Sequence, residues 1–253
     1  MKKILIFLAL FPINTLFGQQ NPCNCSKYEN THSTLRKRAE IRFSGYINGK
    51  EVSKDTIFKD WNDQAKCDAI KSISFSGFDT LPKEFGRFRN VEKLQIFGNF
   101  FTTFIGLNLD YFPKLKELVI EESDLIISDS TKWLTQIEKL TTNKTRIIGL
   151  KTFKRLPSIK YIYMSFSGFD AFPDDFNTLT KLKYLTFGAH LGAIDLDSID
   201  FKELKALEYF EILCWFKGNK GIPKGLTNKI CTKIHYDGIT NESKAKLKNL
   251  TCR

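Results

Sequence analysis

A spaced pattern of three apolar residues recurs along most of the chain. In each copy, an apolar residue is followed three positions later by a second and two positions after that by a third. Six copies are complete: Ile70/Ile73/Phe75, Val91/Leu94/Ile96, Leu115/Leu118/Ile120, Ile159/Ile162/Met164, Leu182/Leu185/Phe187 and Leu207/Phe210/Ile212. Ile137/Leu140/Thr142 ends in a threonine, and Cys231/Ile234/Tyr236 is interpreted as an eighth copy. The copies begin 21–25 residues apart. This period indicates a solenoid, because one unit cannot bury its apolar edge without stacking on its neighbours.

Within each unit, the pattern predicts one strand and one short turn. The last residues of each triplet alternate apolar and polar, as in a strand with one buried face. Further apolar residues follow at spacings of three and four, often after a proline as in Leu81-Pro82 and Phe172-Pro173. Such spacing is typical of a helical or 3-10 turn that returns the chain to the next strand. The sequence therefore predicts an α/β solenoid of about 7–8 repeats over residues 68–229.

Two strand registers remain open at the first and fifth units. The segment Phe75-Ser-Gly-Phe78 recurs as Phe166-Ser-Gly-Phe169, at an offset of 91 residues. That offset would align Phe75 with Phe166, whereas the apolar triplets align Phe75 with Met164.

Different patterns mark the two ends of the chain. Lys2 and Lys3 precede an apolar run over 4–11, which predicts a secretory signal peptide over residues 1–18. This run is shorter than the roughly 20 residues of a membrane-spanning helix. Residues 19–67 are expected to form an N-terminal cap, with a hairpin turning at Asn48-Gly49 and a short helix over 60–66 that ends at Cys67. Residues 230–253 are expected to hold the last strand and a C-terminal cap.

The six cysteines cluster on either side of the repeats. They are Cys23, Cys25, Cys67, Cys214, Cys231 and Cys252. An even number of cysteines in an exported chain favours disulfides, which would staple caps over the open ends of a solenoid. We expect Cys67 to pair with Cys23 or Cys25, and Cys252 to pair with Cys231 or Cys214. A zinc site is the alternative, but the sequence contains no Cys-x-x-Cys pair.

The repeats resemble a known family. The segment from Thr80-Leu-Pro-Lys-Glu-Phe85 through Val91, Leu94 and Ile96 resembles the LPxxLxxLxxLxxLxL consensus of leucine-rich repeat proteins, and the segment from Phe172 to Phe187 is similar. The resemblance implies a curved stack with a parallel β-sheet on its concave side and short turns on its convex side. The chain departs from the family at its conserved asparagine. Only Asn99 lies plainly at that position, and other units carry Phe78, Ser123, Thr145 or Ser167.

Residues between the apolar positions of each strand are expected to point away from the core, onto the concave face. The first outward position is Ser72, Lys93, Glu117, Lys139, Tyr161, Tyr184 and Tyr209 in successive units; the second is Ser74, Gln95, Val119, Thr141, Tyr163, Thr186 and Glu211. Tyrosine is enriched at interfaces because it combines a large apolar area with a polar tip, although aromatic residues also favour strands in general. The candidate ligand-binding residues are Tyr161, Tyr163, Tyr184, Tyr209, Glu211, Lys93 and Glu117.

No motif for catalysis, metal binding or a cofactor is evident. His32, His190 and His235 are far apart, and the sequence contains no HExxH or Gly-x-Ser-x-Gly motif. His235 follows Cys231 by four residues, as in a thiol–imidazole pair, but a structural role in the last strand is favoured.

The formal net charge is +11. Basic charge can attract nucleic acid, but the expected export and the scattered lysines argue against that partner.

The sequence therefore predicts a non-catalytic binding module, without cofactor or metal, that recognises a protein or glycan through its concave face. We expect a monomer that is secreted, periplasmic or displayed on the cell surface. One alternative is a structural or adhesion role without a discrete site. A second alternative is a hydrolase whose active residues match no motif.

Overall fold

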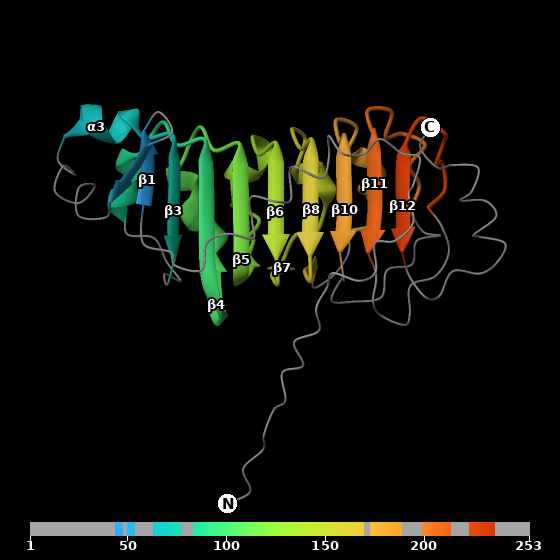
Figure 1. The fold of residues 1–253 in the computed structure, drawn as a ribbon, viewed down its shortest axis with the longest axis horizontal. Coiled ribbons are helices and arrows are strands. Elements are labelled where there is room, and N and C mark those ends of the chain that lie inside the picture. Colours follow the sequence, from blue (N-terminus) through green and yellow to red (C-terminus); the bar gives the residue numbers. More distant parts are fainter. Residues whose placement is uncertain are drawn as a thin grey trace, which may run out of the picture.

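One continuous β-sheet runs through the molecule (Figure 1). The computed structural model describes residues 44–47, 50–53, 63–76, 83–169, 173–188, 199–213 and 223–235. Eight strands pair side by side in parallel: β3 (Ser72–Ser76), β4 (Lys93–Ile105), β5 (Glu117–Ile126), β6 (Lys139–Asn143), β8 (Tyr161–Ser165), β10 (Tyr184–Gly188), β11 (Tyr209–Leu213) and β12 (Cys231–His235). Each strand begins one repeat after its neighbour. The predicted solenoid with a parallel sheet is therefore confirmed.

An antiparallel hairpin extends the sheet before the first repeat. Strands β1 (Ser44–Ile47) and β2 (Lys50–Ser53) pair with each other, and β1 also pairs with β3. The helix α3 (Gln64–Ala69) follows, and the Asp63 carboxylate caps it by accepting a hydrogen bond from the backbone N–H of Lys66 at 3.2 Å. The helix continues for two residues beyond Cys67, so the predicted end of this helix is wrong.

Short 3-10 turns lie behind the sheet and return the chain from one strand to the next (Figure 1). They are η3 (Lys83–Arg87), η4 (Gly106–Tyr111), η5 (Trp133–Thr135), η6 (Phe153–Arg155) and η7 (Phe176–Thr178). Neighbouring repeats cap some of these turns. The Asp175 carboxylate accepts hydrogen bonds from the backbone N–H groups of Phe153 at 2.8 Å and Lys154 at 3.2 Å. These contacts tie the turn of the fourth unit to the turn of the fifth.

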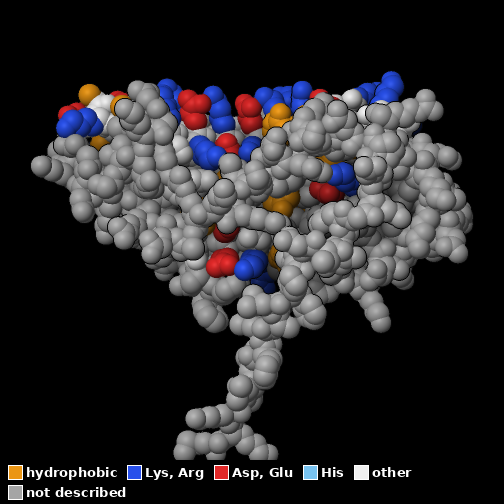
Figure 2. Space-filling view, in the orientation of Figure 1, with side chains coloured by type: hydrophobic (Ala, Val, Ile, Leu, Met, Phe, Trp, Pro, Cys, Tyr) orange, Lys and Arg blue, Asp and Glu red, His pale blue; other side chains and the backbone are white. Residues whose placement is uncertain are grey.

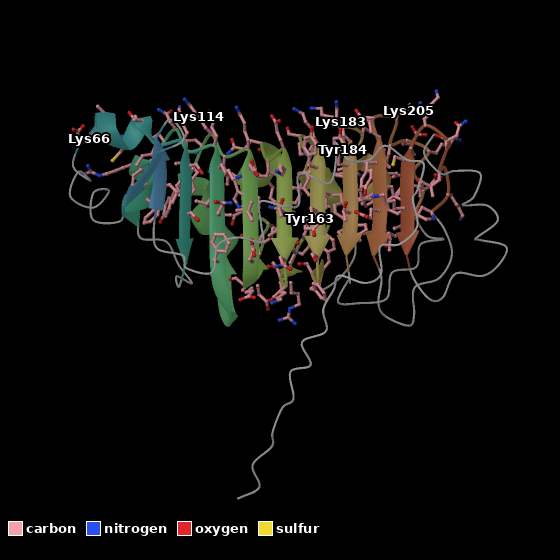
Figure 3. The ribbon with its side chains drawn as sticks, in the orientation of Figure 1. Lys66, Lys114, Tyr163, Lys183, Tyr184 and Lys205 are labelled. Atoms are coloured by element: carbon pink, nitrogen blue, oxygen red, sulfur yellow. The ribbon has the colours of Figure 1, made fainter. Side chains whose placement is uncertain are left out.

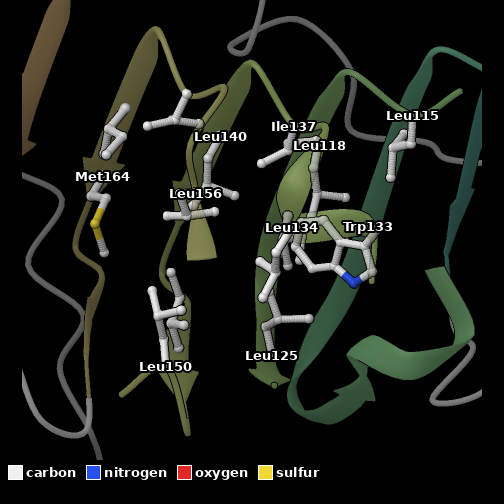
Figure 4. Close-up of a cluster of buried hydrophobic side chains, with 14 of the residues drawn as sticks. Leu115, Leu118, Leu125, Trp133, Leu134, Ile137, Leu140, Leu150, Leu156 and Met164 are labelled. Atoms are coloured by element: carbon white, nitrogen blue, oxygen red, sulfur yellow. The ribbon is translucent and has the colours of Figure 1, made fainter. Parts of the chain in front are cut away.

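The core fills the space between the sheet and the turns, from Cys67 to Ile230. Figure 4 shows its central part, where leucines from strands β5 and β6 meet Trp133 and Leu134 of turn η5. Further along, phenylalanines replace leucine. The rings of Phe153 and Phe176 meet edge to face at 5.3 Å between centroids. A single core shared by every repeat explains why the units cannot be stable separately.

Backbone pairing decides between the two registers that the sequence leaves open. Ile73 is the partner of Leu94, and Ile162 is the partner of Leu140, so the apolar triplets align in both units. The alignment of Phe75 with Phe166 is therefore wrong. Phe166 lies just beyond β8, where its side chain is 49% exposed and its φ is +48°.

The predicted eighth triplet is also wrong, by two residues. In the pairing of β11 with β12, Cys231 is the partner of Tyr209, and Thr232 is the partner of the buried Phe210. Thr232 therefore occupies an inward position, as Thr142 does in the fourth unit, where it is completely buried. Threonine is close in size to valine, and it can fill a position where a search for apolar residues finds none.

Buried hydroxyl groups take the place of the family's asparagine. Ser123, Thr145 and Ser167 lie at equivalent places beyond three successive strands, and all three are buried. The Ser167 hydroxyl accepts a hydrogen bond from the backbone N–H of Thr145 at 3.1 Å, and the Thr145 hydroxyl donates to the Ile120 carbonyl at 3.2 Å. These hydroxyls thus satisfy backbone groups between neighbouring turns.

Several predictions fall on residues outside the described ranges. They include the signal peptide over 1–18, the closing segment after His235, and Cys23, Cys25, Cys214 and Cys252. Cys67 is buried, and Cys231 is disulfide-bonded. The pairings of the cysteines and the domain boundaries stay predictions. In the described ranges, no helix has the length and apolar character needed to cross a membrane.

Candidate functional site on the open face of the sheet

The candidate site is the face of the sheet opposite the core and the turns, which we call the open face. Backbone pairing places the first outward residues in one straight row across the sheet. In order, this row is Ser72, Lys93, Glu117, Lys139, Tyr161, Tyr184, Tyr209 and Cys231. A second row, two residues further along each strand, contains Val119, Thr141, Tyr163, Thr186 and Glu211. We call them the first row and the second row.

Two tyrosines of the first row form a stacked pair. The rings of Tyr161 and Tyr184 lie 4.7 Å apart between centroids, with an angle of 7° between their planes. This distance matches the spacing of adjacent strands, so each ring stands on its strand and faces along the row. The Tyr184 hydroxyl donates a hydrogen bond to the Glu208 carboxylate at 3.0 Å. The pair is therefore held both by stacking and by a hydrogen bond.

The other predicted residues of this half differ in their accessibility. Tyr209 is only 3% exposed, and the Lys233 ammonium lies 5.9 Å from the centroid of its ring. Glu211 is 9% exposed. Tyr163 is half-buried and lies on β8, two residues beyond Tyr161 (Figure 3). The accessible aromatic surface is therefore provided by Tyr161, Tyr163 and Tyr184.

The N-terminal half of the first row carries charges in place of rings. The Glu117 carboxylate lies between two ammonium groups, 3.0 Å from that of Lys93 and 3.1 Å from that of Lys139. Burial alone would raise the pKa of Glu117, but the two lysines outweigh burial and hold the pKa below its ordinary value of 4.5. This arrangement places one carboxylate between two lysines of the row, and both lysines share it as their partner.

The structure adds one residue that the candidate ligand-binding residues did not include. Glu121 lies at a third outward position of β5, four residues after Glu117, and its Oε1 is buried without a hydrogen-bond partner among the described residues. Burial raises the pKa of Glu121, and the neighbouring carboxylate of Glu122 adds to the rise, against opposing effects of Asn143 and Lys144. Extending the strand alternation by one more step would have identified it.

The possible thiol–imidazole pair can be assessed from the backbone. Cys231 and His235 are the first and last residues of β12, which places their Cα atoms about 13 Å apart. Cys231 is disulfide-bonded, so its sulfur is not a nucleophilic thiolate. Among the described residues, no group of three His, Cys, Asp or Glu side chains could hold a metal ion.

Comparison with solved structures agrees with the solenoid fold described above. An internalin (InlF) from Listeria monocytogenes is similar with a TM-score of 0.51 and 16% identity, over 91% of this chain and 67% of that one. The chain has the leucine-rich repeat fold. A leucine-rich repeat protein of Leptospira interrogans is similar with a TM-score of 0.48 and 15% identity, over 73% of this chain and 55% of that one. This leucine-rich repeat chain therefore spans about half the length of the Leptospira protein. No protein-family model matches the sequence, and no curated protein matches it.

Proposed function

We propose that this chain is a non-catalytic binding module that recognises a protein through the tyrosine-bearing half of its open face. The stacked pair of Tyr161 and Tyr184 is the observation that carries the proposal. Solenoids of this kind present an extended surface formed by many strands, and that surface is suited to contact with a large partner.

The geometry of the pair favours a strong contribution to binding. A side chain that is already fixed before binding loses little conformational entropy when a partner covers it. Stacking fixes both rings, and the hydrogen bond to Glu208 fixes the hydroxyl of Tyr184. Tyrosines that are fixed in this way are typical of the few residues that dominate the energy of an interface.

The orientation of the rings favours a protein over a glycan. A sugar binds an aromatic side chain best by lying flat on the face of the ring. In the stacked pair, each ring covers one face of the other, so the edges and hydroxyl tips are directed toward a partner. Edges and hydroxyl groups are suited to the mixed apolar and hydrogen-bonding contacts of protein interfaces.

The cellular context belongs to the same proposal. We infer that residues 1–18 are a signal peptide and that the mature chain acts as a monomer outside the cytoplasm, in the periplasm, at the cell surface or in the medium. The basic and then apolar start of the chain supports export. The position of the cysteines at both ends of the repeats supports an oxidising compartment.

Capture of the partner tests the proposal directly. The full chain, immobilised, would be exposed to extracellular proteins of the source organism or of its surroundings, and the affinity of the captured protein would then be measured. We expect Tyr161→Ala with Tyr184→Ala to weaken binding by about thirtyfold or more, the loss typical of a dominant interface residue. Lys93→Ala with Lys139→Ala, in the same row, is the matched control and should change the affinity by less than about threefold.

Circular dichroism and thermal unfolding would establish that both double variants remain folded. Undiminished binding by a folded tyrosine variant would refute the open-face proposal. Such a result would favour a structural or adhesion role in which no discrete site exists.

A further inference from the structure

A second surface lies along the edge of the sheet where the parallel strands begin, which is the upper edge in Figure 1. The turn before each strand and the single residue just before the strand contribute side chains to this edge. Figure 2 shows Lys and Arg side chains along it, and Figure 3 labels Lys114, Lys183 and Lys205 there. The edge is distinct from the open face that carries the tyrosines.

The acids of this edge are largely neutralised. Three of them form ion pairs with a lysine of a neighbouring repeat: Glu92 with Lys116 at 3.1 Å, Glu138 with Lys160 at 2.7 Å, and Glu208 with Lys183 at 3.5 Å. The fourth acid, Asp68, accepts a hydrogen bond from the Gln64 side chain at 2.9 Å.

Six further cations of this edge form no ion pair with the described residues. They are Lys71, Arg89, Lys114, Lys181, Lys205 and Lys229, which we call the basic rim. All six are exposed. The rim therefore has an excess of positive charge that the rest of the described structure does not compensate.

The opposite edge of the sheet differs. Lys144 and Arg146 follow the end of β6, and Lys151 follows the end of the short strand β7 (Arg146–Ile148). Each of the three pairs with an acid one repeat away, at 2.8, 2.7 and 2.9 Å. These three cations of the opposite edge are thus compensated, whereas the six cations of the basic rim form no ion pair with the part of the chain that the structure describes.

We propose that the basic rim binds a linear acidic polysaccharide that carries sulfate or carboxylate groups. The rim cations form two groups of three along one line, before β3, β4 and β5 and before β10, β11 and β12. Seven strand spacings between β3 and β12 give the line a length of about 34 Å. Within each group, one strand spacing is close to the advance of one sugar ring along an extended polysaccharide. Two groups of point charges along one line fit a linear polyanion better than they fit the plane of a membrane.

The composition of the rim disfavours nucleic acid. Proteins that bind single strands combine cations with aromatic side chains on which the bases stack. Between Asp68 and Ile230, the described turns that precede the strands and the single residue just before each strand contain no aromatic residue. The tyrosines that open three of the strands, Tyr161, Tyr184 and Tyr209, belong to the open face. Five of the six rim cations are lysines, which attract anions as point charges without the paired hydrogen bonds of arginine.

Binding of the full chain to heparin, a linear sulfated polysaccharide, tests this proposal, with neutral dextran as the uncharged polymer. We expect heparin to bind with an affinity that falls steeply as salt rises, because bound cations release counterions from the polymer. The triple variant Lys181→Glu, Lys205→Glu and Lys229→Glu should weaken binding by about tenfold or more, and it should also reduce the salt dependence.

A second triple variant controls for net charge. Lys132, Lys154 and Lys224 are exposed and lie on the side of the short turns. Their replacement by glutamate changes the net charge by the same amount and should weaken heparin binding by less than about threefold. Equal losses in the two triple variants would overturn the proposal and assign binding to net charge alone. Tighter binding to anionic vesicles or to single-stranded DNA than to heparin would overturn the choice of ligand.

Discussion

The two halves of the first row have the same backbone geometry but different chemistry. From Lys93 to Lys139 the row consists of alternating charges, with Glu117 held between two lysines at 3.0 and 3.1 Å. From Tyr161 to Tyr209 it consists of aromatic rings, two of which stack at 4.7 Å. Strand spacing and register are common to both halves, so the difference arises only from the side chains that the sequence places there.

This difference shows how one sheet can support a solvated region and a region suited to binding. Partly exposed ion pairs are screened by water and salt, and they contribute little to stability or affinity. Stacked rings remove apolar surface from water, and their contribution does not depend on salt. We therefore expect changes in the tyrosine half to have larger effects than changes in the charged half.

The largest difference between the two halves should be the loss of folding stability when Tyr209 is replaced. Its side chain is almost fully buried, so Tyr209→Ala should destabilise the fold by about 3 kcal/mol through lost packing and a residual cavity. Lys93→Ala, in the same row of the charged half, should change the free energy of unfolding by about 0.5 kcal/mol or less. Urea unfolding of both variants measures the contrast, and equal effects would show that Tyr209 contributes no packing energy.

The rows of the open face could be predicted from the sequence, but accessibility within them could not. Once the apolar triplets place Leu118 and Ile120 toward the core, the alternation of a strand forces Glu117 and Val119 to the other side. Burial on the open face depends on what other parts of the chain cover it. No periodicity along one strand could show that Tyr209 is buried while Tyr184, in the same row, is not.

The misplaced eighth triplet and the register left open at the first and fifth units have a related cause. The search for apolar residues passed over Thr232, and it could not decide whether Phe75 aligns with Phe166 or with Met164. Backbone pairing places Thr232 inward and aligns Phe75 with Met164. Phe166 instead follows its strand with a positive φ, as do Glu122 and Lys144 at the equivalent places of the two preceding units. The sequence signals this turn by the small hydroxyl residue that comes next, and not by the apolar pattern.

A smaller difference should appear in the coupling free energy between neighbouring side chains within each half. A double-mutant cycle with Tyr161→Ala and Tyr184→Ala should give a coupling free energy of about 0.5–1.5 kcal/mol, as expected for a stacked aromatic pair. The corresponding cycle with Lys93→Ala and Glu117→Ala should give about 0.2–1 kcal/mol, decreasing in high salt. A tyrosine coupling that decreases with salt to the same extent would contradict the distinction between the two halves.

The smallest effect is the dependence of folding stability on pH, and it should have opposite signs for two glutamates on β5, Glu117 and Glu121. The folded-state pKa of Glu117 lies below its ordinary value of 4.5, because the two lysines outweigh burial. Its ionisation therefore stabilises the fold above pH 4.5, and this stabilisation is lost as the pH falls through the lowered pKa. Glu117→Gln should reduce stability at pH 7 by under about 1 kcal/mol, and the deficit should vanish in acid.

Glu121 should show the opposite dependence. Its folded-state pKa is raised by burial, so the protonated form is favoured in the folded protein, and stability is lost as the pH rises from 4.5 through the raised pKa. Glu121→Gln replaces the carboxylate with a neutral amide of similar size. This variant should be more stable than the unmodified chain at pH 7 and equally stable below pH 4.5. Chemical denaturation of the unmodified chain, Glu117→Gln and Glu121→Gln from pH 3 to pH 8 measures how each substitution changes the free energy of unfolding. A change of the same sign at pH 7 in both variants would show that the lysines flanking Glu117 do not determine its ionisation.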